Sequence, residues 1–136
     1  MAMISRRSLL EGGPAAILGA FFAQSVAQGA PGPLFVQDLP KVSLDGWTVT
    51  ASEVDYEPGG VSKPHRHPGF VLGYVLEGEV RFQLKGGQER ICKTGEMFYE
   101  PPGSVHLVSA NASSTNKARL LAMVFAEKGQ MLSMPA

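Results

Sequence analysis

The sequence predicts an all-β fold, an antiparallel sandwich or small barrel, and two observations lead to this expectation. Sixteen glycines and ten prolines interrupt the 136 residues at short intervals. Between them lie at least seven apolar runs of strand length, and none of these runs continues as a helical period. Many short strands separated by turns are typical of sandwiches and barrels, and barrel closure also removes exposed sheet edges.

The strands can be placed in order along the chain. The run "WTVTASEVDY", residues 47–56, alternates with period two, so Glu53 and Tyr56 project to opposite faces. The run "FVLGYVLEGEVRFQL", residues 70–84, predicts two strands with a bend near Gly78. Further strands are expected in "LKGGQERICK", a hairpin with its tip at Gly86-Gly87, and in "EMFYE", "HLVSA" and "ARLLAMVFA".

Length and composition limit the classes of function. A chain of 136 residues has room for one domain with a real core. Lysine plus arginine equal aspartate plus glutamate at 12 each, with no basic block, so nothing indicates a nucleic-acid partner. Cys92 is the only cysteine, which excludes an intramolecular disulfide and a thiolate cluster. Any metal ion must therefore be held by nitrogen and oxygen ligands, and the expected partner is a small molecule.

Residues 1–27 are predicted to be a signal peptide. A pair of arginines precedes a moderately apolar stretch, residues 14–23, and a small-x-small cleavage site at residues 25–27. The apolar stretch is too short for a comfortable transmembrane helix, so no permanent membrane anchor is expected. Residues 28–44 form the predicted linker and N-terminal edge segment, and residues 45–136 the predicted domain.

The arginine pair suggests a particular export route. "SRRSLL", residues 5–10, resembles the bacterial twin-arginine signal, although Glu11 stands where a basic residue is usual. The alternative is an ordinary secretory signal. The resemblance implies a periplasmic or secreted protein that is exported folded, which would suit a protein that acquires a metal ion before it leaves the cytoplasm.

The three histidines are the candidate functional residues. His65 and His67 are two residues apart, and in a strand such residues share a face with Cα atoms roughly 6.6 Å apart, so their imidazoles can converge on one ion. His106 follows a second Gly/Pro-rich segment, "GEMFYEPPGSVH". For each histidine alone, a structural side chain is the alternative.

The spacing of these residues resembles the two motifs of the cupin family. The first motif has a glycine, H-x-H, a glutamate and a closing glycine, and it is matched by Gly59, His65, His67 and Gly78. The second has a glycine, P-x-G, a histidine and an asparagine, and it is matched by Gly95, Pro101, Gly103 and His106. Val71 or Leu72 stands at the glutamate position, and Asn111 comes one residue too late, with Ala110 in its place. Two motifs in register are a specific signal.

The resemblance implies a small single-domain cupin of type 2, an antiparallel β-barrel of the double-stranded β-helix or jelly-roll kind. Carried over by position, it implies that His65, His67 and His106 bind a divalent metal ion. The ion can be Fe, Mn, Ni, Cu or Zn, because imidazole suits all of them. Without a glutamate at Val71, the site is expected to have three neutral ligands and to border an apolar recess at Gly73.

Two glutamates and an aromatic pair are further candidates for the site. Glu53 and Glu100 are possible substitute carboxylates, but a solvated residue at a strand end is the preferred interpretation of each. Tyr99 or its neighbour Phe98 must face inward, and core packing is expected for either, with a substrate-binding phenol as the alternative for Tyr99. No catalytic residue can be assigned.

The resemblance leaves two functions open, besides a purely structural cupin whose histidines bind no metal. One is a metal-dependent oxygenase, dioxygenase-like, that acts on a small oxygen-rich substrate, as some cupins do on diketones and flavonols. The other is a non-catalytic module that binds a metal or small ligand. A homodimer is also expected, since Leu72, Tyr74 and Leu76 form an outward apolar face, although the linker could cover that face instead.

Overall fold

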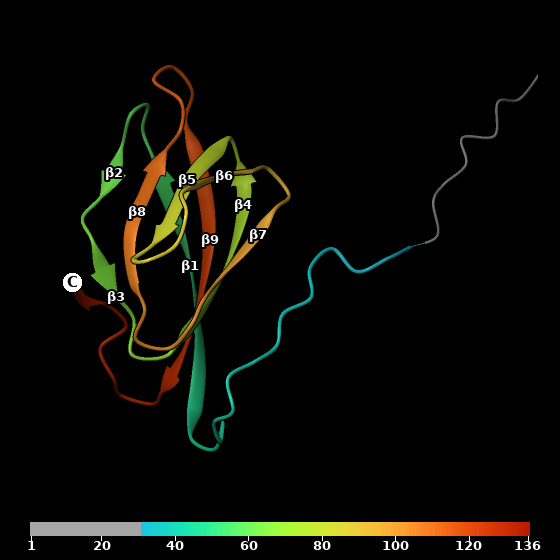
Figure 1. Cartoon of the computed structure of the whole chain (residues 1–136), viewed down its shortest axis with the longest axis vertical. Helices are drawn as coiled ribbons and strands as arrows, with labels where there is room; N and C mark the ends of the chain where they lie inside the picture. Colours follow the sequence, from blue (N-terminus) through green and yellow to red (C-terminus); the bar gives the residue numbers. More distant parts are fainter. Residues whose placement is uncertain (1–30) are drawn as a thin grey trace, which may run out of the picture. The chain divides into compact units, whose positions relative to one another are not determined.

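The computed structural model describes residues 31–136, which form two packed antiparallel sheets (Figure 1). The four-stranded sheet has the order β1-β9-β4-β7, made of Trp47–Tyr56, Ala118–Glu127, Phe70–Glu77 and Met97–Glu100. The second sheet has the order β10-β3-β8-β5-β6, made of Met134–Pro135, His65–Arg66, Val105–Asn111, Glu79–Leu84 and Arg90–Lys93. Strand β2, Val61–Ser62, also pairs with β8. The prediction of an all-β antiparallel fold is confirmed.

The turns are where the glycines predicted them. Gly78, with a φ of 72°, separates β4 from β5, and Gly86, with a φ of 84°, turns the hairpin between β5 and β6. Both conformations lie in the left-handed region that side chains with a Cβ rarely adopt. The predicted signal peptide, residues 1–27, lies outside the described residues. Within residues 31–136, no helix is long and apolar enough to cross a membrane.

The apolar core fills one part of the space between the sheets. It contains side chains from both sheets, among them Val75, Val80, Phe82, Cys92 and Phe98. Cys92 is fully buried there, and burial raises the pKa of its thiol. Cys92 lies on β6, within the run "LKGGQERICK" that the sequence predicts to form a hairpin.

Strand β8 contains a bulge that affects the site. Gln83 on β5 is opposite Val108, but the next residue, Leu84, is opposite His106, so Leu107 is an extra residue. In a regular strand His106 and Ser109, three apart, would face opposite sides. The bulge lets both face the interior, where they are 2% and 4% exposed, while Leu107 points outward.

The same bulge accounts for the late asparagine of the second motif. Asn111 is buried, and its amide donates hydrogen bonds to the carbonyls of Glu57 and Asn116 at 3.1 and 2.7 Å. Its side-chain oxygen accepts from the Ser113 N–H at 2.9 Å. One extra residue after His106 moves the asparagine by one position.

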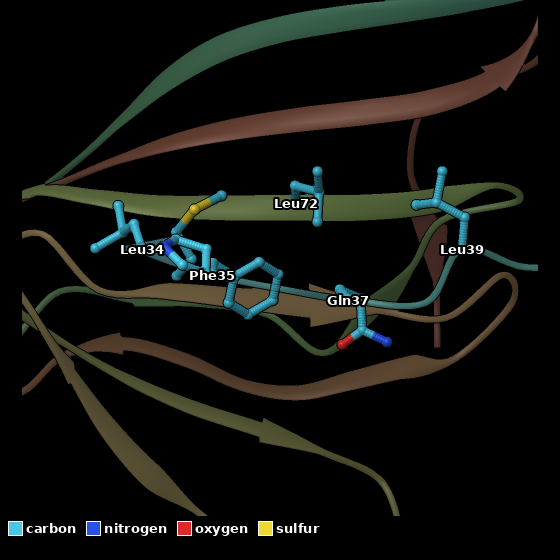
Figure 2. A pocket seen from close by; sticks show the side chains of 7 residues that line it. Leu34, Phe35, Gln37, Leu39 and Leu72 are labelled. Carbon is cyan, nitrogen blue, oxygen red and sulfur yellow. The ribbon is translucent and has the colours of Figure 1, made fainter. Parts of the chain in front are cut away.

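Part of the predicted linker lies on the outer face of the four-stranded sheet. Leu34, Phe35 and Leu39 lie beside Leu72 in a shallow groove of about 400 Å³, whose lining also includes Met97 (Figure 2). The sequence predicts an outward apolar face that includes Leu72 and is covered either by a second copy of the chain or by the linker, and here linker residues lie against Leu72. The described residues that line the groove include no histidine and no carboxylate.

Candidate metal centre

The three histidines come from two segments that are distant in the sequence, residues 65–67 and β8, and they meet in one cavity between the two sheets. His65 lies on β3 and is directly opposite His106 on β8, while His67 lies in the connection to β4. The His65 ring centroid is 5.0 Å from that of His67 and 5.1 Å from that of His106. Arg66 between them is exposed, as the alternation of the strand predicts.

The cavity has a volume of about 100 Å³ and is lined by both sheets. Its polar lining comes from the histidines, Glu100, and the hydroxyls of Tyr56, Ser62 and Ser109. Its apolar lining consists of Val54, Val71, Phe98, Leu120 and Ala122. Val71, the residue at the glutamate position of the first motif, therefore faces the cavity.

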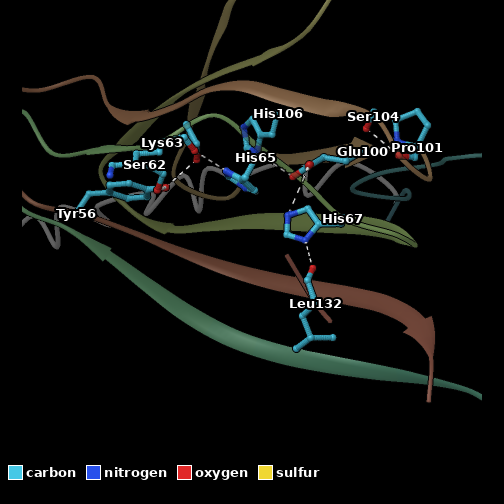
Figure 3. A network of polar contacts seen from close by, with 11 residues as sticks. Tyr56, Ser62, Lys63, His65, His67, Glu100, Pro101, Ser104, His106 and Leu132 are labelled. Atoms are coloured by element: carbon cyan, nitrogen blue, oxygen red, sulfur yellow. Dashed lines mark hydrogen bonds and ion pairs between the residues drawn. The ribbon is translucent and has the colours of Figure 1, made fainter. Parts of the chain in front are cut away.

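Backbone carbonyls hold the rings of His65 and His67. Nδ1 of His65 donates to the carbonyl of Lys63 at 2.8 Å, and Nδ1 of His67 donates to the carbonyl of Leu132 (Figure 3). In this tautomer the Nε2 atom of each ring carries the free lone pair that a metal ion requires. Burial, opposed by the hydrogen bond to Lys63 and assisted by the two other rings, lowers the pKa of His65, which keeps its imidazole neutral at pH 7.

A carboxyl group lies among the histidines. Oε1 of Glu100 is 3.1 Å from Nδ1 of His106, and Oε2 is 3.9 Å from Nε2 of His67 (Figure 3). The Glu100 side chain is only 3% exposed. The prediction of a solvated strand-end residue is therefore wrong for Glu100, and the cavity contains a carboxyl group in addition to the three histidines.

Glu53, by contrast, behaves as predicted. Its side chain is 58% exposed and lies 3.7 Å from Nη1 of Arg119. It therefore belongs to the solvated face of β1, away from the cavity.

The expected apolar recess at Gly73 is occupied. A Cβ built on Gly73 would come within 2.2 Å of Cζ of Phe98, because the Phe98 ring fills the space that a side chain would take. Phe98 is the inward member of the pair and is 1% exposed. Tyr99 faces the other side and packs near Phe70, at 6.1 Å between ring centroids, so it does not line the cavity.

Tyr56 is a cavity residue that the sequence did not single out. Its hydroxyl is 2.9 Å from Oγ of Ser62 and 2.7 Å from Oγ of Ser109, and the three oxygens form one buried polar group. The alternation of β1 predicts which face of the strand Tyr56 occupies. No motif near Tyr56 in the sequence indicates that this face lies close to the histidines.

Two observations bear on whether these residues fit a metal ion. Within residues 31–136, no group of three or more His, Cys, Asp or Glu side chains meets the geometry of a metal site as it stands. Yet the only buried side-chain nitrogen or oxygen atoms without a hydrogen-bond partner in this part of the chain are Oε2 of Glu100 and Nε2 of His106. Both belong to this cavity, and such atoms call for a partner. The donor set of imidazoles and a carboxyl group is also one that divalent transition metals accept.

Comparison with known proteins gives the class of this chain. Residues 52–124 match the family model described as "Cupin domain", so the chain belongs to the cupin family. It is 34% identical over 84 residues to a germin-like protein, subfamily 2 member 2, of Arabidopsis thaliana, covering 58% of this chain and 37% of the relative. The chain thus spans well under half the length of that curated relative.

Solved structures share the fold. The DMSP lyase DddQ of Ruegeria pomeroyi superposes with a TM-score of 0.56 at 19% identity, over 65% of this chain and 43% of the lyase. A recombinant oxalate oxidase in complex with glycolate superposes with a TM-score of 0.53 at 23% identity, over 79% of this chain and 66% of the oxidase. At these identities the likeness establishes the cupin fold alone.

Proposed function

We propose that this cupin binds a divalent metal ion through His65, His67 and His106, and that the loaded site acts on a small oxygen-rich substrate. The observation that carries the proposal is the convergence of the three rings on one cavity that also contains the two unpartnered buried atoms. His65 and His67 are already oriented through Nδ1, which is how proteins commonly prepare a histidine ligand.

The cavity limits the size of the substrate. A volume of about 100 Å³ is well below the roughly 300 Å³ at which sites for drug-sized ligands begin, so we propose a substrate of a few heavy atoms. The related oxalate oxidase structure contains glycolate, a ligand of this size. A bound divalent ion would polarise the oxygen atoms of such a chelating molecule as a Lewis acid.

The remaining lining residues would orient the substrate and exclude water. The linked hydroxyls of Tyr56, Ser62 and Ser109 can each donate or accept a hydrogen bond to a substrate oxygen. On the apolar side, Val71 and Phe98 are each 1% exposed and form a wall that excludes water from that side of the cavity. In the oxygenase form of the proposal, dioxygen is the co-substrate.

The second candidate is a module that binds the metal or a small ligand without turnover. The observation that favours it is the contact between Glu100 and His106, because it occupies the one carboxyl group at the cavity that could act as a general base.

Metal content tests the first part of the proposal. Untagged protein would be loaded in turn with Fe, Mn, Ni, Cu and Zn, and elemental analysis should find about one equivalent of at least one metal. His106→Ala should lose it, whereas Leu107→Ala, which alters the outward neighbour, should retain it. Less than about a tenth of an equivalent in the wild type, unchanged in His106→Ala, would refute metal binding.

Oxygen consumption separates the two candidates. Fe(II)-loaded protein would be mixed with small hydroxy acids, diketones and catechols while dissolved oxygen and products are followed. Uptake that disappears in His106→Ala supports the oxygenase. Measurable ligand binding without uptake or product supports the non-catalytic module.

For localisation we propose export to the periplasm through the arginine pair. Replacing Arg6 and Arg7 with lysine keeps the charge but removes the twin-arginine character. The variant should accumulate in the cytoplasm, as cell fractionation would reveal. Unchanged export would instead indicate an ordinary secretory signal.

A further inference from the structure

We propose that Glu100 supplies a carboxylate ligand to this metal centre, from β7 instead of from the β4 position of the first cupin motif. The inference rests on the proposed function, that His65, His67 and His106 hold the ion. It gives the centre four protein ligands, one of which is anionic, whereas the motif residues alone provide three neutral ligands.

The burial of Glu100 is the first argument. A glutamate side chain is almost never fully buried unless it is paired or coordinates a metal, and Glu100 is only 3% exposed. Within residues 31–136, its only ion-pair contacts are with the imidazoles of His106 and His67. Among the described salt bridges no lysine or arginine approaches it.

The strand register is the second argument. Val71 on β4 and Glu100 on β7 are direct partners in an antiparallel ladder. Side chains of such partners project from the same face with Cβ atoms about 4.5–5.5 Å apart. Both residues line the histidine cavity. A carboxylate on Glu100 can therefore enter the space that a glutamate at Val71 would have used.

The contacts of the two Glu100 oxygens help to distinguish a metal ligand from a residue that only positions His106. Oε1 lies 3.1 Å from Nδ1 of His106, and a residue that only positioned His106 would need no more than this atom. Oε2 faces Nε2 of His67 at 3.9 Å and has no hydrogen-bond partner. Coordination of an ion gives that second oxygen a function.

The ligand also alters the charge of the centre. Three neutral imidazoles leave the full charge of a divalent ion, whereas one carboxylate reduces it by one unit. Oxygen ligands suit Mn(II) and other hard ions better than imidazoles alone do, so Glu100 should broaden the range of metals that bind tightly.

The decisive variant is Glu100→Gln, because the amide keeps an oxygen that can accept from Nδ1 of His106 but loses the charge. Its Kd for Co(II), measured by competition with a chromophoric chelator, should rise more than about 100-fold, beyond the 10–100-fold typical of an outer partner. The visible spectrum of bound Co(II) should change as well. Glu53→Gln, on the exposed outer face, is the matched control and should change neither.

Moving the carboxylate across the ladder tests the register. In the double variant Val71→Glu/Glu100→Val, the affinity for Co(II) should recover at least tenfold relative to Glu100→Gln. If the double variant unfolds at the same temperature as the wild type but its affinity for Co(II) does not recover, the inference is wrong. A Glu100→Gln protein whose Kd and spectrum are unchanged would also contradict it. If the wild type itself binds no Co(II) or other divalent ion, the proposed function fails first, and the two failures are thereby distinguished.

Discussion

Replacing Gly73 with alanine should destabilise the protein, although glycine lies there in a strand where alanine would ordinarily be preferred. Gly73 on β4 is directly opposite Phe98 on β7, and an added Cβ would lie 2.2 Å from Cζ and 2.5 Å from both Cε atoms of that ring. Carbon atoms in contact need about 3.5 Å, so the ring must move by roughly 1.3 Å. It has little room, because Phe98 is 1% exposed and its ring centroid is 4.3 Å from that of Phe82.

The magnitude follows from two opposing effects. Overpacking a well-packed core lowers the free energy of unfolding by about 1–3 kcal/mol. In the opposite direction, alanine reduces the conformational entropy of the unfolded chain, which raises the free energy of unfolding by about 0.4–1 kcal/mol. The clash therefore dominates, and the free energy of unfolding should fall by about 1–2 kcal/mol. Urea titration followed by tryptophan fluorescence would measure it, with an unchanged m-value.

A matched control and a rescue make the prediction refutable. Gly32→Ala adds the same methyl group where no atom lies within 4 Å, and it should change the unfolding free energy by no more than about 0.5 kcal/mol. Shortening the opposing side chain in Gly73→Ala/Phe98→Leu should make the double variant more stable than the sum of the single effects. Strict additivity, or a Gly73→Ala protein as stable as the wild type, would show that the ring does not occupy this space.

Three further predictions concern buried polar groups. The thiol of Cys92 is fully buried, and burial raises its pKa. It should therefore not react with Ellman's reagent at pH 8 until the protein is unfolded. Rapid labelling of the folded protein would show that Cys92 is not in the core. Asn111→Ala should lower the unfolding free energy by about 1–2 kcal/mol, because it leaves the part-buried hydrogen-bonding carbonyls of Glu57 and Asn116 without their donor. Asn116→Ala, at an exposed position, should have little effect, and equal losses would refute this role. Tyr56→Phe should cost about 1 kcal/mol, since it removes the hydroxyl that lies 2.7 Å from Ser109, and a more stable variant would argue against that hydrogen bond.

Local patterns explain why most of the fold could be predicted. The limits of β1 were read from its period-two alternation alone, and the bend at Gly78 from a glycine between two apolar runs. The short strands β3 and β10 were not found, because a pair of two-residue strands has no period to detect. The contact that fixes His67 was also out of reach, since the carbonyl of Leu132 is 65 residues away along the chain.

Glu100 illustrates a different limit. Along the chain it is the last residue of a short strand before two prolines, which favours a solvated position, and the structure buries it because β7 pairs with β4 and faces β8. The glutamate position of the first motif lies on a single strand, β4, so the motif describes the side chains of that strand only. In an antiparallel ladder, however, the residue opposite reaches the same space. The first motif therefore lacks a glutamate at Val71, although the cavity contains one at Glu100. The pairing of Val71 with Glu100 depends on the strand register, which cannot be predicted from the spacing of residues in the sequence.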